Sequence, residues 1–393
     1  MPRTDSPVCP FEHIQNPAQE AEQIAQITDL TVKLLDKRYP SPNKILRGVH
    51  PKSHGCVKAL FEINPDIDPD YQVGLFNSPG KKFDAFIRFS NAAVLVGADI
   101  DKEGNHGSRG MAIKVMDVGG EVLVDDNGAH NQDFLMINQP MFAFANTEDY
   151  LRLTKIIFAN NDVPDAFFAP LKLQSPDLTE EEKQRIVEYI RAENLSEDDI
   201  KRIGDSFKIA KLIKSTPIAN PLEVQYFSAA PFLFGPDRVM KFSAKPSAEI
   251  VSPQIPENPS DNYLREVLKE TMSKNEAVNF DFMLQVRKDI DDDMGIENAS
   301  TSWDEDQYPF IKVAKITISA PQLEIDSEES EAHCEKLAFN PWHSLTEHQP
   351  IGSINRLRKS VYEASAEHRH EKQQLPFFLL WLEKLFKFLF GSR

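Results

Sequence analysis

Short stretches of alternating apolar and polar residues fill much of the chain between residues 46 and 320, and prolines and glycines separate them. The stretches are 56–63, 83–90, 109–117, 121–125 and 134–137 in the first half, and 222–229, 238–246, 279–286 and 310–319 in the second. A period of two between turn-forming residues predicts β-strands. Strands spaced so closely favour an antiparallel barrel or sandwich over a doubly wound sheet.

Apolar residues follow a helical period in other regions. Asn16 and Pro17 form a helix-start signal, and apolar residues recur at helical spacing from there to about Lys37. Between the two groups of strands, further helices are predicted to start near Thr147, Thr179 and Ser196. Each of these starts combines a capping residue with acidic residues, which stabilise the first turn. We therefore expect an α+β fold in which a helical insertion divides the strands.

The composition narrows the class of protein. The 393 residues, 41% of them hydrophobic, are sufficient for a large globular core. The net charge of -17 argues against a basic nucleic-acid-binding surface, so no nucleic-acid partner is expected. The three cysteines, Cys9, Cys56 and Cys334, lack zinc-site spacing and cannot all pair, which favours a reducing compartment. No apolar run near residue 1 resembles a secretory signal, and we expect a cytoplasmic protein.

The C-terminal segment RLRKSVYEASAEHRH has helix-like spacing of charged and aromatic residues. Arg358 and Tyr362 are four residues apart, so in a helix they lie on one face, with the guanidinium close to the phenol oxygen. A fixed cation favours the phenolate, which is a hard donor suited to ferric iron. Arg369 returns to the same face two turns later and is placed to hold an anionic group. The alternative is an exposed amphipathic helix with scattered arginines.

The segment RGVHPKSHGC contains Arg47, His50 and His54 at the start of a predicted strand. A histidine in this position can point into a barrel mouth, where an imidazole with an ordinary pKa near 6.5 takes and returns a proton. A purely structural histidine and a zinc ligand are the alternatives. Zinc is disfavoured because the proline and glycine in this segment argue against a helix and because the glutamate of a metalloprotease motif is missing.

Two further segments carry polar residues in unusual positions. Arg88 and Ser90 share one face of a predicted strand, while Phe89 points to the other, and a ligand with carboxylates would account for the arginine. Asn138 ends an apolar strand just before Pro140. Its amide either donates to an oxygen species near the histidine or closes a turn.

Taken together, these segments resemble the haem catalase superfamily over about residues 45–370. The motifs RGVH with a following FE strand, IRFSN, RGMAIKV, INQPMF and RxxxYxxxxxxR occur in the order found in catalases, and SWDEDQYPFIKVAKITIS and FNPW precede the last of them. The chain is short, and one additional residue separates the histidine from the FE strand. In these respects it is more similar to the small catalase-related haem proteins, which include allene oxide synthase and other enzymes acting on fatty-acid hydroperoxides.

The resemblance implies a catalase-like barrel, a C-terminal haem-ligand helix, and haem b with tyrosinate-ligated ferric iron as cofactor. It implies that Tyr362 is the metal ligand and that Arg358 keeps it ionised. His50 corresponds to the distal acid and base, and Asn138 to its distal partner. Ser90 corresponds to the serine that orients the imidazole.

The resemblance also implies how the edge of the cofactor is bound. Arg47, Arg88 and Arg369 correspond to the arginines that bind the haem propionates. Val49 lies beside the distal histidine, and a valine here agrees with true catalases and differs from the threonine of allene oxide synthases. His54 has no such counterpart and is interpreted as structural.

The resemblance implies a reaction class with open alternatives. The leading hypothesis is a haem enzyme that cleaves the O–O bond of fatty-acid hydroperoxides, with an isomerase, lyase or peroxidase outcome. The second is a hydrogen-peroxide peroxidase or weak catalase, which Val49 favours. The third is a haem-binding protein without turnover.

The last segment, residues 375–393, is rich in Phe, Leu and Trp. Its apolar part, 377–390, is about 21 Å long as a helix, too short to span a membrane of about 30 Å. Glu383, Lys384 and Lys387 gather on one side, which is typical of a helix lying in a membrane interface. Docking on the barrel, or on a partner subunit of a homo-oligomer, is the alternative. We thus predict an N-terminal arm (1–45), a haem-binding domain (46–374) and this helix (375–393), with a cytoplasmic or peripheral membrane location.

Overall fold

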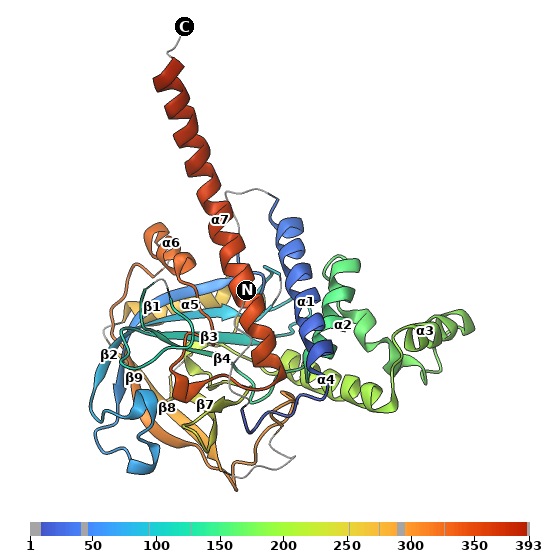
Figure 1. The fold of residues 1–393 in the computed structure, drawn as a ribbon, viewed down its shortest axis with the longest axis horizontal. Coiled ribbons are helices and arrows are strands. Elements are labelled where there is room, and N and C mark those ends of the chain that lie inside the picture. The colour runs from blue at the N-terminus through green and yellow to red at the C-terminus, as the bar shows by residue number, and fades with distance from the viewer. Residues whose placement is uncertain are drawn as a thin grey trace.

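An antiparallel barrel forms the centre of the molecule (Figure 1). The computed structural model describes residues 9–40, 46–93, 95–126, 128–250, 252–274, 276–288, 295–325 and 327–390, with side chains as far as residue 372. The strands are β1 Ser53–Ile63, β2 Lys82–Asn91, β3 Arg109–Val115, β4 Gln132–Ile137, β5 Tyr226–Phe227, β6 Phe232–Leu233, β7 Val239–Pro246, β8 Val278–Arg287 and β9 Ile311–Ile318.

The sheet closes because its first and second halves pair at both edges. β1 pairs with β9, and β5 pairs with both β4 and β7, so that strands β1 to β5 and β7 to β9 form a ring while β6 extends β7 as a hairpin. Every pairing between these named strands is antiparallel. The antiparallel barrel predicted from the alternating pattern is confirmed, and closure leaves few unpaired strand edges.

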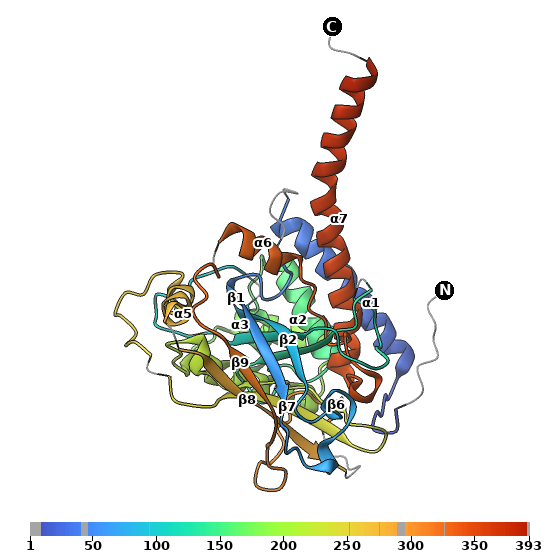
Figure 2. The same cartoon turned by 90° about the vertical axis from the view of Figure 1, so that its left-hand side faces the viewer.

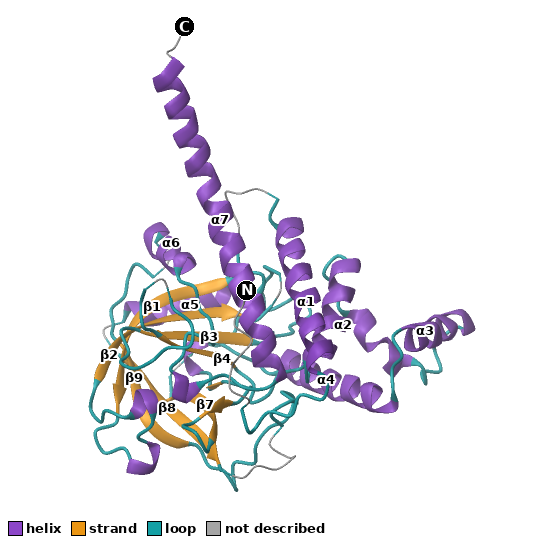
Figure 3. Ribbon diagram, viewed as in Figure 1, coloured by secondary structure: helices purple, strands orange, loops and turns teal. Residues whose placement is uncertain are grey.

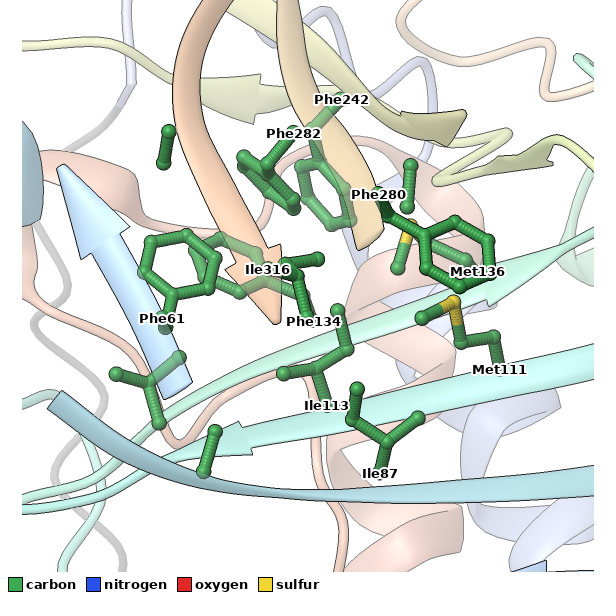
Figure 4. Close-up of a cluster of buried hydrophobic side chains, with 14 of the residues drawn as sticks. Phe61, Ile87, Met111, Ile113, Phe134, Met136, Phe242, Phe280, Phe282 and Ile316 are labelled. Atoms are coloured by element: carbon green, nitrogen blue, oxygen red, sulfur yellow. The ribbon is translucent and has the colours of Figure 1, made fainter. Parts of the chain in front are cut away.

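Aromatic side chains fill the inside of the barrel (Figure 4). The ring centroids of Phe134 and Phe282 are 4.6 Å apart, and those of Phe61 and Phe282 are 5.1 Å apart. Phe89 is also fully buried in this core, as expected from its position between Arg88 and Ser90. Because the barrel interior is packed with side chains, the cavity described below lies against the outer face of the strands.

Helices α1 to α4 and α7 gather on one side of the barrel, while α5 and α6 pack near β1 (Figure 3). They are α1 Pro17–Arg38, α2 Thr147–Ala159, α3 Glu180–Ala192, α4 Glu197–Ser215, α5 Tyr263–Ser273, α6 Glu328–Lys336 and α7 Ser353–Phe390. The predicted helical insertion is confirmed, since α2, α3 and α4 lie between β4 and β5 in the chain. The capping boxes at Thr179 and Ser196 are present, whereas the cap of α2 is Asn146, one residue before the expected Thr147.

One strand prediction is wrong. Residues 121–125 form no strand, and within this stretch only Val122 makes an isolated bridge, to Leu345. The segment runs into a turn in which the backbone N–H of Gly128 donates to Asp125 Oδ2 at 2.7 Å. Alternation is not sufficient for a strand here, because a neighbouring strand must also supply hydrogen-bonding partners.

Helix α1 packs between α2 and α7, and this contact brings the N-terminal region against the barrel domain (Figures 1 and 2). Ile27, Leu151 and Leu357, one from each helix, form a small buried cluster. Arg356 of α7 also forms an ion pair with Glu20 of α1 at 2.6 Å. The predicted start of α1 is confirmed, with Asn16 accepting from the N–H of Gln19.

Helix α7 is longer than expected, because it runs as one helix from Ser353 to Phe390 and projects beyond the barrel (Figure 2). Residues 361–372 are mostly good helix formers, and the helix continues past the predicted boundary at 374 even though Pro376 lies there. The side chains of 373–390 and all of 391–393 lie outside the described residues, so the membrane-surface prediction for 375–393 falls outside them too. In the part of the chain whose side chains are described, no helix has both the length and the apolar character needed to cross a membrane.

Candidate functional site

A cavity of about 920 Å³, part of it open to solvent, lies between the outer face of the barrel and α7. Its barrel wall follows from strand register. Arg88 pairs with Ala112, and Ala112 pairs with Leu135, so one row of side chains crosses β2, β3 and β4 on the outer face. Ser90, Gly110 and Ile137 form the next row.

The cavity brings together eight of the nine residues to which the sequence assigns a functional role. They are Arg47, Val49, His50, Arg88, Ser90, Arg358, Tyr362 and Arg369. These residues come from the segment before β1, from β2 and from α7. Thr31 of α1 also lines the cavity, so the N-terminal region contributes to its wall.

His50 is held from three directions. Its Nδ1 lies 3.0 Å from Ser90 Oγ, its backbone N–H donates to the carbonyl of Ala93 at 3.0 Å, and its own carbonyl accepts from Arg88 Nη2 at 2.9 Å. The residue adopts a positive φ of 57°, a conformation that costs energy and persists only when the surroundings enforce it. Because Ser90 occupies Nδ1, the second ring nitrogen, Nε2, is left for a ligand in the cavity.

Burial, and then the charges of Arg88, Arg358 and Arg47, lower the pKa of His50 to about 3. The sequence predicts an imidazole with a pKa near 6.5, whereas the buried imidazole has a much lower pKa. The imidazole is therefore neutral at pH 7, and its protonated form is disfavoured as long as the three arginine charges are uncompensated.

Gly110 is a site residue that the sequence did not predict, although it lies in the RGMAIKV motif. A β-carbon at this position would lie 2.5 Å from His50 Nδ1 and 2.9 Å from Ser90 Oγ. The imidazole therefore lies against the backbone of β3. A glycine inside a strand often marks the close approach of another group, so the sequence did contain a signal for this contact.

A cluster of three arginines and one carboxylate lies at another part of the cavity. Glu335 of α6 is 2.5 Å from Arg47 and 3.4 Å from Arg88. Burial alone would raise the pKa of Glu335, but Arg47, Arg88 and Arg369 together hold it below its ordinary value. Burial, and then repulsion from Arg88, lower the pKa of Arg47 to about 9.

This arginine cluster has unmet hydrogen-bonding capacity. The Nε atoms of Arg88 and Arg369 are buried and have no hydrogen-bond partner. Three guanidinium groups facing the single carboxylate of Glu335 leave an excess of two positive charges. Buried positive charge in excess of its counter-charge is costly, so the cluster suits a ligand that brings two carboxylates.

Arg358 and Tyr362 lie on the same face of α7, as predicted. The guanidinium carbon of Arg358 is 5.4 Å from the centroid of the Tyr362 ring, so the cation lies over the ring. Its Nη1 donates to Asn355 Oδ1 at 3.0 Å, and Asn355 in turn donates to the carbonyl of Pro231 at 2.8 Å. Asn355, which the sequence interpretation missed, thus fixes the arginine beside the tyrosine.

A second tyrosine lies near Tyr362. Burial, with a further contribution from Tyr362, raises the pKa of Tyr150 to about 12. Tyr150 is therefore a neutral phenol at neutral pH. It belongs to α2, and nothing in the local sequence indicates that the helical insertion reaches the site.

Asn138 and His54 make their contacts outside the cavity lining. The Oδ1 of Asn138 accepts from Ser108 Oγ at 3.0 Å and from the N–H of Arg109 at 2.8 Å, so its distal role stays a prediction. His54 is fully buried, with Nε2 at 2.9 Å from Asn91 Oδ1, in agreement with a structural role.

Comparisons with known proteins identify the fold. No protein-family model matches the chain, and no curated protein sequence matches it. Solved structures do match. They include a fungal catalase (TM-score 0.55, 17% identity, 82% of this chain and 59% of that one), catalase A from Saccharomyces cerevisiae (0.54, 16%, 95% and 68%) and a bacterial catalase (0.54, 15%, 94% and 63%). The chain thus has a catalase-like fold and spans about 59% to 68% of the length of these catalases.

Proposed function

We propose that this chain, which has a catalase-like fold, is a haem enzyme that cleaves the O–O bond of fatty-acid hydroperoxides, as small catalase-related haem proteins do. The observation that carries the proposal is the composition of one cavity. It is lined by a tyrosine beside a fixed arginine, a neutral histidine oriented by a serine, and three arginines with unmatched hydrogen-bonding capacity.

The residues present fit a haem. The unpartnered Nε atoms of Arg88 and Arg369 and the charge excess of the arginine cluster suit two propionates. Tyr362 would hold the iron. Within the described part of the chain, no cluster of three His, Cys, Asp or Glu side chains is suited to a metal. A haem iron does not need such a cluster, because the porphyrin supplies most of its ligands.

The chain's own residues would prepare the substrate. The haem iron, when bound, supplies the redox chemistry that splits a peroxide. His50 accepts the proton of the entering hydroperoxide and returns it to the departing oxygen. Ser90 and Gly110 keep the imidazole in one orientation for both steps. Arg358 places a positive charge over the ring of Tyr362.

Apolar residues near His50 support an organic substrate. Val49 lines the cavity and is 45% exposed. Leu95 and Val96 are 44% and 55% exposed, and they follow Ala93, whose carbonyl is bonded to His50. An exposed valine in the cavity wall, with exposed apolar residues nearby in the chain, suits a fatty-acyl substrate. A hydrophobic tail segment such as 375–393 would bring the protein to the membrane surface where such lipids occur.

Hydrogen peroxide is the second candidate substrate. It is favoured by the similarity in fold to catalases and by Val49, which agrees with true catalases. The test is to load the full chain with haem and to compare its turnover of linoleate hydroperoxides and of hydrogen peroxide, with identification of the products. We expect faster turnover of the lipid hydroperoxide. A clear preference for hydrogen peroxide would replace the first candidate by the second, and a haem-loaded protein that turns over neither would refute both.

A further inference from the structure

Three of the seven large apolar side chains that are exposed within the described ranges belong to segments that meet beside His50. They are Val49, Leu95 and Val96, and we call this group the mouth patch. Val49 directly precedes His50 and also lines the large cavity. The patch is therefore continuous with the cavity next to the histidine.

Two hydrogen bonds hold the other two members of the patch near His50. The carbonyl of Ala93 accepts from the backbone N–H of His50 at 3.0 Å, and the carbonyl of Gly97 accepts from Lys52 Nζ at 2.8 Å. Three residues separate Ala93 from Gly97 in the chain. Because two residues of extended chain span at most about 7 Å, the exposed side chains between these carbonyls stay close to the histidine.

The mouth patch is uncharged. No charged residue occurs between Asn91 and Asp99 in the sequence. The charged side chains at the base of this segment, Lys52 and Asp99, are buried and pair with each other at 2.7 Å. A ligand that covers the patch therefore meets hydrocarbon and not a cation.

We propose that the mouth patch is an acyl-chain subsite, which holds the hydrocarbon chain of a lipid hydroperoxide while its peroxide group reaches His50. The proposal rests on the function proposed above and names the part of that substrate which the protein recognises. Val49 belongs both to the patch and to the cavity wall, so an occupant that accounts for both extends along both. A flexible hydrocarbon chain does so, whereas a folded protein partner covers the patch without entering the cavity.

Such a subsite favours lipid hydroperoxides over hydrogen peroxide. Each methylene group that leaves water for an apolar surface tightens binding by about fourfold, and hydrogen peroxide has no carbon to contribute. Because the patch is uncharged, a methyl ester should bind as well as the free acid. The length of the hydrocarbon chain, and not the carboxylate, then sets the affinity.

Binding and kinetics of the haem-loaded full chain test the proposal. The double variant Leu95→Asn, Val96→Thr replaces two exposed apolar side chains by polar ones of similar size. Binding of linoleic acid, which has no O–O bond, is measured by equilibrium dialysis. We expect the variant to bind linoleic acid about tenfold more weakly, because contact with some two methylene groups is lost. Its KM for linoleate hydroperoxide and for the methyl ester should rise by a similar factor, with kcat and the turnover of hydrogen peroxide unchanged.

Leu323→Asn is the matched control, because Leu323 is 62% exposed and lines a different cavity. It should keep the wild-type Kd and KM. Equal Kd values for the double variant and the wild type, or no binding of linoleic acid by the wild type, would overturn the proposal. A much higher KM for the methyl ester than for the free acid would also overturn it.

Two further outcomes separate this proposal from its alternatives. A changed sedimentation coefficient of the double variant with an unchanged Kd would overturn the proposal, since the patch would then be a contact between copies of the chain. If linoleic acid binds through the patch but no lipid hydroperoxide is turned over, the acyl-chain subsite stands and the proposed reaction fails.

Discussion

A β-carbon on Gly110 would lie 2.5 Å from Nδ1 of His50, so it is the absence of a side chain on β3 that lets the imidazole lie against the strand. We expect Gly110→Ala to displace the ring and to break its 3.0 Å contact with Ser90 Oγ. Hydroperoxide cleavage should fall by about 10²-fold or more, because a misplaced acid–base group loses most of its effect. Turnover, measured together with haem content from the absorption spectrum, checks this prediction.

Gly119→Ala is the matched control for this experiment. Gly119 is exposed, and a β-carbon there meets nothing within 4 Å. The control should keep wild-type turnover. Equal turnover in Gly110→Ala and Gly119→Ala would remove His50 from the proposed mechanism.

Tyr362→Phe should remove the oxygen that would hold the haem iron. The variant keeps the ring beneath the Arg358 guanidinium, so packing should change little. We expect the tyrosinate-type ferric absorption spectrum to be lost. Tyr150→Phe is the matched control, because it removes a neighbouring phenol and should retain that spectrum. A Tyr362→Phe protein with wild-type haem content and spectrum would contradict the assignment.

Glu335→Gln should strengthen binding of a dicarboxylate ligand. Glu335 competes for Arg47 and Arg88, and its removal leaves the buried arginines with more uncompensated positive charge. We expect haem dissociation, followed by transfer to a haem-scavenging globin, to slow several-fold. Haem with esterified propionates should show no such gain.

Glu331→Gln is the control on the same helix. Glu331 is exposed and pairs with Arg265, away from the arginine cluster. It should leave haem dissociation unchanged. Faster loss of haem from Glu335→Gln than from Glu331→Gln would argue against propionate binding by these arginines.

The free energy of unfolding should depend on pH through buried histidines. Burial lowers the pKa of His348 to about 4, and that of His54 to about 3. The unfolded state, with an ordinary histidine pKa near 6.5, takes up protons first as the pH falls. Stability is therefore complete above about pH 6.5 and decreases between about pH 6.5 and 4, by roughly 3 kcal/mol for His348.

Chemical denaturation at several pH values measures this dependence. His348→Gln, which keeps an acceptor for the N–H of Leu75, should flatten the slope between about pH 6.5 and 4. His13→Gln, at an exposed position, should leave the slope unchanged. Identical slopes in wild type and His348→Gln would show that His348 titrates alike in the folded and unfolded states.

Deletion of residues 375–393 should release the protein from liposomes. The hydrophobic character of this segment, with Glu383, Lys384 and Lys387 on one side, predicts binding through apolar insertion. Co-sedimentation with neutral lipid vesicles measures the effect. If the shortened and full chains co-sediment equally, the segment has no membrane role.

Local patterns in the sequence determined the elements and much of the candidate site. Alternation predicted the barrel strands, and capping signals predicted α1, α3 and α4. The spacing of Arg358 and Tyr362 placed them on one helix face, and alternation placed Arg88 and Ser90 on one strand face. These predictions succeed because side-chain direction follows directly from the period of a helix or strand.

Only the tertiary structure decided which distant segments meet. Residues 121–125 alternate like a strand but find no neighbouring strand to pair with. Glu335 reaches the arginines and Tyr150 reaches Tyr362 because strand register and helix packing join segments that are far apart in the chain. The low pKa of His50 likewise comes from burial among three arginines. Such contacts depend on the packing of the whole chain, and no local pattern encodes them.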